Sequence, residues 1–199
     1  MPVTMLPASF KIVELKLSIA LAGDNPRRQL NKSRNPALPF AEMWQGSIAF
    51  AAVNRADAVA QHAVLEAFDG KVTAFGVTLK QGFATHANSF SGTLAAAAVA
   101  GSDTISLSSG TMTDLKAGTL LQIGTPGDAN YQLVELLDDA SIKTAVSVYI
   151  APRIRYAINS GTTVTGGDVT AVLKLNKDEL QAAFNIDNGA VSVDVIEAV

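Results

Sequence analysis

Two histidines are the first residues to examine for chemistry, because imidazole binds metals and transfers protons near neutral pH. His62 is followed four positions later by Glu66, and a His–Glu pair one helical turn apart can bind a metal. No HExxH motif completes such a site, and His86 stands in a small polar stretch without a recognisable partner. We therefore interpret His62 as a solvated residue on a helix and His86 as an ordinary loop residue. The prediction is no metal site and no cofactor.

Other catalytic patterns are equally sparse. The sequence has no G-x-S-x-G nucleophile motif, no phosphate-binding G-x-x-x-x-G-K-[ST] loop and no G-x-G-x-x-G motif after a strand. The acid pairs Asp138-Asp139 and Asp178-Glu179 fit solvated turns better than a glycosidase site, although such pairs are formed in three dimensions and spacing alone does not exclude them. We expect no catalytic residues and no enzymatic activity.

Composition narrows the class of protein. The chain has 199 residues, of which 48% are hydrophobic and 17% charged, and this excludes an intrinsically disordered chain. No apolar run approaches the ~18 residues of a membrane helix, and the first residues do not resemble a secretory signal. The absence of cysteine excludes disulfides, thiolate zinc sites and cysteine nucleophiles. A net charge of −3 gives no overall field that would attract nucleic acid.

Charge is distributed unevenly along the chain. Residues 22–39 form a proline-punctuated loop with one acid, Asp24, whereas residues 176–199 are mainly acidic. A basic loop and an acidic region on one chain could meet head to tail between neighbouring copies, which is how such contacts close into rings. The alternative is a mobile, solvated loop. The candidate subunit-interface residues are the basic residues of this loop, Arg27, Arg28, Lys32 and Arg34.

Hydrophobic periodicity predicts a mainly β protein with one helix. Residues 13–21 alternate with period two and predict a half-buried strand, which the loop of residues 23–39 separates from a second strand at 44–50. An amphipathic helix is predicted after Asn54, a residue type that favours helix N-termini, and Gly70 is a suitable stop. A further strand over 75–79 completes this unit.

The predicted helix has an apolar half that we expect to pack on the sheet. Its members are Ala56, Val59, Ala60, Ala63, Val64, Ala67 and Phe68. The expected solvent-facing half consists of Gln61, His62, Glu66 and Asp69.

An inserted domain is indicated by two polar stretches, residues 85–92 and 159–167, which bracket about seventy residues. Short strands are predicted inside it at 104–107, 119–123, 131–136 and 145–150. Their turn chemistry is typical of a small barrel or sandwich. After it, residues 169–175 alternate, and Asp187-Asn188-Gly189 predicts a hairpin turn before a last strand at 191–195. The predicted domains are 1–88 with 166–199, which is discontinuous, and the all-β insertion 89–165.

Several short motifs resemble one known family. The segment Trp44-Gln45-Gly46-Ser47-Ile48-Ala49-Phe50, the helix ending in Phe68-Asp69-Gly70, and Phe75-Gly76-Val77 resemble an arrangement found in a tail protein of long-tailed bacteriophages. Residues 115–124, Leu-Lys-Ala-Gly-Thr-Leu-Leu-Gln-Ile-Gly, and 150–155, Ile-Ala-Pro-Arg-Ile-Arg, resemble the L-x-A-G-D-x-I-x-I and I-x-P-x-L-R segments of that family. The closing residues 193–198 resemble its final strand ending in Glu-Ala. Thr119 departs from the family pattern, which often has Asp there.

This resemblance to distal tail (baseplate) proteins implies a structural virion component assembled in the host cytoplasm. In that family a tail-tube-like β-sandwich with one helix forms a hexameric ring around the DNA channel and joins the tail tube to the tip or hub. A second β domain is carried on the outside. The resemblance also fits other tail ring proteins, namely the tail tube and tail terminator proteins, because they share much of this architecture.

We therefore expect a homo-oligomeric ring whose partners are tail tube and tip or hub proteins, with no membrane and no sequence-specific nucleic acid. Strand edges, the helix face not buried in its own domain, and the basic loop would supply the contacts. A rival hypothesis is a carbohydrate-binding adhesion module, which predicts exposed rings around Tyr131, Tyr149 and Tyr156. For Trp44, Phe50 and Phe75 the strand pattern favours core packing.

Overall fold

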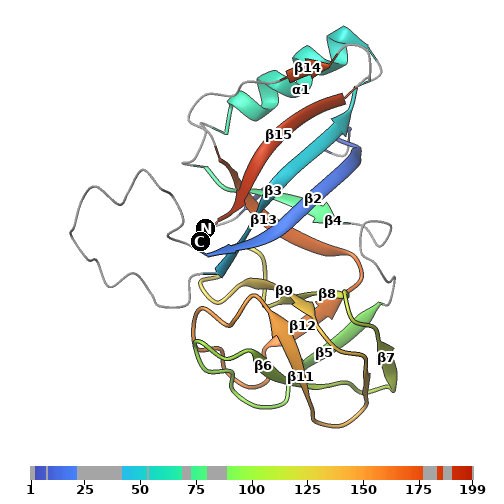
Figure 1. The fold of residues 1–199 in the computed structure, drawn as a ribbon, viewed down its shortest axis with the longest axis vertical. Helices are drawn as coiled ribbons and strands as arrows, with labels where there is room; N and C mark the ends of the chain where they lie inside the picture. The colour runs from blue at the N-terminus through green and yellow to red at the C-terminus, as the bar shows by residue number, and fades with distance from the viewer. Residues whose placement is uncertain are drawn as a thin grey trace, which may run out of the picture. The chain divides into compact units, whose positions relative to one another are not determined.

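The fold is described from a computed structural model covering residues 3–7, 9–21, 42–52, 54–68, 73–79, 89–176, 183–185 and 190–198. It is mainly β, as predicted, and α1 (Arg55–Glu66) is the one helix in the described part of the chain. Contacts divide the chain into two compact units (Figure 1). The barrel unit comprises Met1, Ile19–Met43 and Thr78–Thr170, and the sheet unit comprises Pro2–Ser18, Trp44–Val77 and Ala171–Val199.

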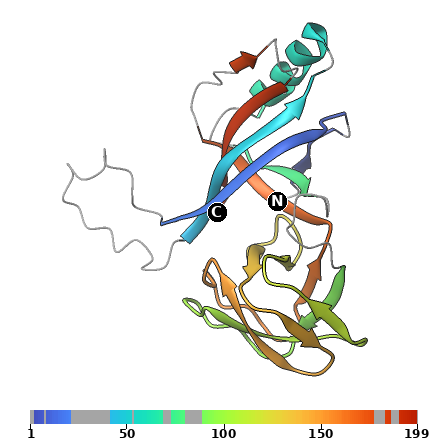
Figure 2. The same cartoon turned by 45° about the vertical axis from the view of Figure 1, so that its right-hand side comes forward.

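A seven-stranded sheet organises the sheet unit, with strand order β1-β4-β13-β15-β3-β2 and with β14 paired to β15. β1 and β4 are parallel, whereas β15 is antiparallel to β3, β13 and β14. The long strands curve and twist in the usual way for such sheets (Figure 2). The strand bounds are Thr4–Met5 (β1), Ile12–Leu21 (β2), Glu42–Ala51 (β3), Phe75–Leu79 (β4), Val169–Leu175 (β13), Ala183–Asn185 (β14) and Ala190–Glu197 (β15).

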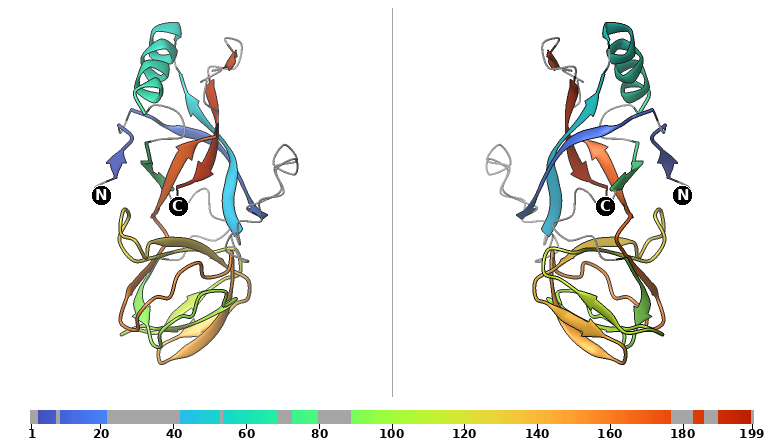
Figure 3. Two further views of the ribbon diagram at one scale, coloured as in Figure 1. Left: turned by 90° about the vertical axis from the view of Figure 1, so that its left-hand side faces the viewer. Right: turned by 90° about the vertical axis from the view of Figure 1, so that its right-hand side faces the viewer.

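The sheet is apolar on one face. Trp44, Phe50 and Phe75, for which core packing was predicted, are 4%, 0% and 0% exposed. The Phe68 ring, just past the end of α1, lies 5.0 Å from the Phe75 ring, and so ties the helix to β4. Figure 3 shows α1 to one side of the long strands of the sheet. Phe10 meets Phe50 edge-on at 5.1 Å, a favoured aromatic geometry.

A closed six-stranded barrel forms the body of the barrel unit. Its order is β11-β6-β5-β12-β8-β9, and every neighbouring pair is antiparallel. Closure leaves this sheet without an open edge. The bounds are Phe90–Leu94 (β5), Thr104–Ser108 (β6), Leu120–Ile123 (β8), Gln132–Leu136 (β9), Val146–Ala151 (β11) and Thr163–Gly166 (β12), and β7 (Thr113–Leu115) pairs separately with β10 (Ala140–Ile142).

Inward-facing aliphatic residues fill the barrel. Leu107, Leu121, Ile123, Leu136 and Val164 are completely buried. All four strands predicted in the insertion are present, displaced by one residue at most at either end. The predicted hairpin turn at residues 187–189 lies outside the described part, although Asn185 and Ala190, which flank it, are paired antiparallel.

Gly46 allows β2 and β3 to approach closely. A Cβ atom built on Gly46 would lie 1.7 Å from the carbonyl oxygen of Lys16 and 3.0 Å from the Cα of Leu17. Both of these atoms are backbone, so no side-chain rotation relieves the clash. Any side chain at this position therefore separates the two strands.

We expect Gly46→Ala to destabilise the sheet unit by about 1–3 kcal/mol or more, in the range of overpacked interiors. Trp44, the single tryptophan of the chain, is buried two residues away, and its fluorescence reports unfolding of this unit. Gly110 is a matched control, because a Cβ built there meets nothing within 4 Å. If Gly46→Ala and Gly110→Ala unfold at the same denaturant concentration, the close approach does not limit the fold.

Candidate functional site

The outer edge of β2 is the longest open strand edge that the structure describes. β2 has 10 residues and stands last in the strand order, so no described strand pairs with its outer side. Two of its apolar residues, Val13 and Ile19, are 55% and 37% exposed. The predicted apolar side of this strand is therefore only partly covered. An edge with unpaired backbone groups and exposed apolar side chains favours pairing with another chain.

The other side of β2 is polar. The Lys16 ammonium lies 2.7 Å from the Glu14 carboxylate, and both side chains are well exposed. The Ser18 hydroxyl donates to the Gln45 carbonyl oxygen at 3.3 Å. A pocket of about 370 Å³ opens on this face, lined by Lys16, Leu17, Ser18, Gln45, Gly46, Ser47, Asn176 and Asp194. Hydroxyls, amides and single charges of this kind suit hydrated contacts, and they do not assemble a nucleophile with its base.

The helix is rotated relative to the prediction. Its buried residues are Ala58, Gln61 and Leu65, followed by Phe68 just beyond its end. The predicted apolar half is instead exposed at Ala56, Val59, Ala60, Ala63 and Ala67, and only partly covered at Val64. The expected burial was therefore wrong for these six residues and is confirmed for Phe68, the seventh member of that half. The expected exposure of Gln61 was wrong, that of Glu66 is confirmed, and Asp69 and Gly70 lie outside the described residues.

A hydrogen bond explains the burial of Gln61. Its side chain is 7% exposed, and Nε2 donates to the carbonyl oxygen of Ala51 at 2.7 Å. Ala51 ends β3, so this bond fixes the helix rotation where the chain leaves the sheet. At the N-terminus, the Asn54 side chain accepts a hydrogen bond from the Asp57 amide at 2.9 Å, as predicted for a helix cap.

Of the candidate metal ligands, the structure describes His62 and Glu66. His62 Nδ1 lies 3.5 Å from the Glu66 carboxylate, the predicted pair along the helix. In the described ranges no group of three or more metal-ligating side chains comes together. Those same ranges contain no helix with the length and apolarity to cross a bilayer. The other predicted residues, namely His86, Asp178, Glu179 and the basic set Arg27, Arg28, Lys32 and Arg34, lie outside the described residues.

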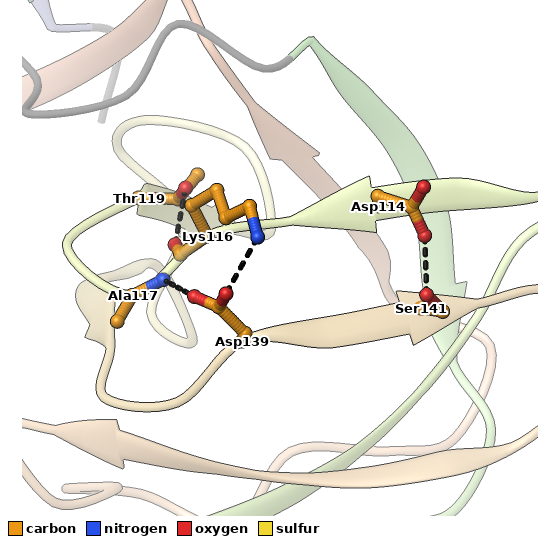
Figure 4. Close-up of polar contacts among 6 residues, drawn as sticks. All are labelled: Asp114, Lys116, Ala117, Thr119, Asp139 and Ser141. Atoms are coloured by element: carbon orange, nitrogen blue, oxygen red, sulfur yellow. Dashed lines mark hydrogen bonds and ion pairs between the residues drawn. The ribbon is translucent and has the colours of Figure 1, made fainter.

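Asp139 organises a turn of the barrel unit rather than a catalytic centre (Figure 4). Its carboxylate accepts hydrogen bonds from Lys116 Nζ at 2.6 Å and from the Ala117 amide at 2.9 Å. The hydrogen bond to Asp139, together with its charge, raises the pKa of the Lys116 ammonium. Asp114 binds the Ser141 hydroxyl on the adjacent strand pair. Both acids therefore hold β7, β10 and the following turn together.

The segment at residues 115–124, which was compared above with a tail-protein motif, has a structural role of the same kind. Leu115 is 1% exposed, Gly118 has a φ of 86° that favours glycine, and the Thr119 hydroxyl donates to the Lys116 carbonyl oxygen at 2.6 Å. Thr119, where the family often has Asp, is itself 1% exposed. These positions shape a tight turn and contact no described cavity.

Gln132 anchors residues 150–155, the Ile-Ala-Pro-Arg-Ile-Arg segment, in the barrel unit. This buried side chain accepts a hydrogen bond from the Arg155 amide at 3.0 Å and donates to the Arg153 carbonyl oxygen at 2.7 Å. It thus provides the backbone bonds that a neighbouring strand would supply. The glutamine carries no chemical motif, so nothing in the sequence marks this role.

The three tyrosines of the adhesion hypothesis have different environments. Tyr131 is 6% exposed, and its hydroxyl donates to the Thr170 carbonyl oxygen, so it does not belong to an exposed cluster. Tyr149 and Tyr156 are 55% and 38% exposed. Tyr149 pairs with Thr104 on β6, and Leu137, 49% exposed, donates its amide to the Tyr149 carbonyl oxygen. On neighbouring β9, burial raises the pKa of the Glu135 carboxyl.

A hydrogen bond joins Trp44, in the segment of residues 44–50, to Glu197, in the closing segment of residues 193–198. The Trp44 amide donates to Glu197 Oε2 at 3.1 Å, and both residues are 4% exposed. A carboxylate buried to this extent is expected only where hydrogen bonds stabilise it. The bond couples the first residues of β3 to the end of β15.

Comparison with known proteins adds no relative: no family model matches the sequence, and no curated protein matches it. The surfaces described above are therefore interpreted from their own chemistry.

We expect Glu197→Ala to destabilise the sheet unit by about 1–3 kcal/mol, because it leaves the buried Trp44 amide without its acceptor. Glu197→Gln keeps an acceptor oxygen and should cost less. Trp44 fluorescence during denaturation measures both variants. Equal losses for the two variants would show that the hydrogen bond is not what Glu197 contributes.

Proposed function

We propose that this protein is a structural component of a bacteriophage tail. Its copies form a ring, hexameric by the family resemblance, at the distal end of the tail tube, and the ring connects the tube to the tip or hub. The sheet unit is the tail-tube-like ring domain in this proposal, and the protein has no enzymatic role. A tail tube or tail terminator ring is the nearest alternative.

The open edge of β2 is the observation that carries this proposal. A ten-residue edge that no described strand pairs with, and on which Val13 and Ile19 are exposed, makes a lone subunit prone to uncontrolled pairing. Ring closure satisfies every such edge with the neighbouring copy and limits the assembly to a defined size. The phage-like residues support the same proposal, because Trp44, Gly46 and Glu197 position β3 between β2 and β15.

Ring formation is tested by light scattering at several concentrations, followed by negative-stain imaging. The expected mass is about six times that of the 20.7 kDa chain. Val13→Lys combined with Ile19→Lys should reduce the assembly to monomers without unfolding, since both side chains are exposed. Val99→Lys is the matched control, because Val99 is 71% exposed and does not lie on β2.

Two results would contradict the proposal. One is a monomer at all concentrations that also fails to bind purified tail tubes. The other is a ring whose mass the double β2 variant leaves unchanged, which would remove the edge as its contact.

A carbohydrate-binding adhesion module is the second candidate, and the exposed Tyr149 ring is the observation that favours it. The ring lies opposite Thr104, on a barrel strand whose next outward residue, Ser147, is also exposed. Aromatic faces with nearby hydroxyls suit stacking against sugar rings. Tyr131 is buried and so does not belong to the expected cluster, which makes the adhesion module a weaker candidate than the tail ring protein.

A glycan array decides between these candidates for the barrel unit. The adhesion hypothesis expects binding that Tyr149→Ala abolishes and that Tyr131→Phe, which alters only a buried hydroxyl, leaves intact. An array without signal, together with unchanged host attachment by Tyr149→Ala particles, removes the hypothesis.

A further inference from the structure

The exposed face of α1 has an internal symmetry. Its apolar residues follow the order Ala-x-x-Val-Ala-x-x-Ala-Val-x-x-Ala, which reads identically in both directions. The members are Ala56, Val59, Ala60, Ala63, Val64 and Ala67, here called the palindromic face. Five of the six are exposed and Val64 is half-buried. The sheet unit buries the opposite side of the helix, so its own packing does not account for this face.

A palindromic face can complement itself in an antiparallel pair. When two copies of such a helix pack antiparallel about a two-fold axis, Ala56 meets Ala67 of the second copy and Ala60 meets Ala63. Val59 and Val64 lie about 140° apart around the helix, so they border this row of alanines on opposite flanks. The four alanines let the two backbones approach. A parallel pair also matches each residue with its own copy, so the charges at the two helix ends select the antiparallel arrangement.

The charges at the two ends follow the same symmetry. Arg55 and Glu66 stand eleven positions apart, about three helical turns, so they occupy one flank at opposite ends of the helix. In an antiparallel pair each flank faces its own counterpart. Arg55 of one copy then lies beside Glu66 of the other, twice in each pair, and both residues are exposed in the single chain.

The other flank borders a hollow. Ala60 and Val64 line a pocket of about 370 Å³, whose other lining residues are Pro7, Ser9, Phe10, Lys11, Ala51, Asp57 and Gln61. Gln61 Oε1 is buried beside it and has no hydrogen-bond partner among the described residues. A buried acceptor without a donor destabilises a protein, so this side of the helix has space and an unsatisfied polar atom where an incoming chain would lie.

We propose that two copies of this chain associate through α1, antiparallel, by the palindromic face. The contact is additional to a ring contact, because a ring repeats one head-to-tail interface whereas this interface pairs a surface with itself. It does not rest on the proposed tail function.

Cysteine crosslinking tests the geometry directly, since the chain has no cysteine of its own. Ala56→Cys and Ala67→Cys should each remain uncrosslinked alone under mild oxidation, because the two identical positions would be about 16 Å apart along the helix axis. An equimolar mixture of the two variants should give disulfide-linked heterodimers. A mixture of Ala56→Cys with Ser147→Cys, an exposed position on the barrel, measures random collision.

A second measurement tests the charges. Arg55→Glu should weaken self-association in sedimentation velocity about twofold to thirtyfold, since two exposed ion pairs are lost. The exchanged variant Arg55→Glu/Glu66→Arg should restore it. Neither change harms the isolated helix, because an acid at its start and a base at its end favour the helix dipole.

Three results would overturn the proposal: heterodimers no more abundant than the Ser147 control, crosslinking of Ala56→Cys with itself, or an exchanged variant as weak as Arg55→Glu. Ring mass is measured separately with the β2 variants, so the ring and the helix contact can each fail alone.

Discussion

The sheet unit depends on how closely β2 approaches β3 at Gly46. A ten-residue strand can be added at the edge of the sheet only because no side chain separates the Lys16 carbonyl from the Gly46 backbone. Once β2 is in place, its apolar residues extend the inner face, and its outer backbone becomes the open edge of the sheet. One missing Cβ thus determines both how far the core extends and where another chain can be added.

The helix shows how a single hydrogen bond can decide which of two apolar faces is buried. Either side of α1 could cover a sheet, since one carries Ala58, Leu65 and Phe68 and the other carries the palindromic face. The larger side chains favour the first side because they bury more apolar area. The Gln61 bond to the Ala51 carbonyl favours the same side, because it satisfies a backbone acceptor where β3 ends. The face that stays outside consists of alanine and valine. The helix therefore carries more apolar residues than the packing of the sheet unit uses.

Periodicity predicted the strands well and the helix orientation badly, for one reason. A strand alternates with period two, so an apolar run such as Leu173 and Leu175 has one possible inner side, and both residues are buried. For a helix with apolar residues on both sides, periodicity does not determine which side is buried. The shortest strands, β1, β7, β10 and β14, carry two or three residues each, too few for any pattern. β5 and β12 were missed because they begin or lie in the polar stretches, residues 85–92 and 159–167, that were interpreted as the boundaries of the insertion. The bonding of Gln132 and Glu197 was unpredictable because it joins residues 21 to 153 positions apart.

The same distinction separates the two surfaces on which assembly is argued. The edge of β2 exposes backbone that no described strand pairs with and that accepts any strand of suitable length, so in the proposed ring the specificity comes from ring closure. The palindromic face exposes only side chains: its row of alanines lets a second helix approach closely, and the charges of Arg55 and Glu66 favour the antiparallel direction. The two surfaces lie on different elements and imply different symmetries, the first cyclic and the second two-fold. Alone, the proposed cyclic contact generates a single ring and the proposed two-fold contact generates a dimer. Together they generate a closed pair of rings when the two-fold axis crosses the ring axis at a right angle.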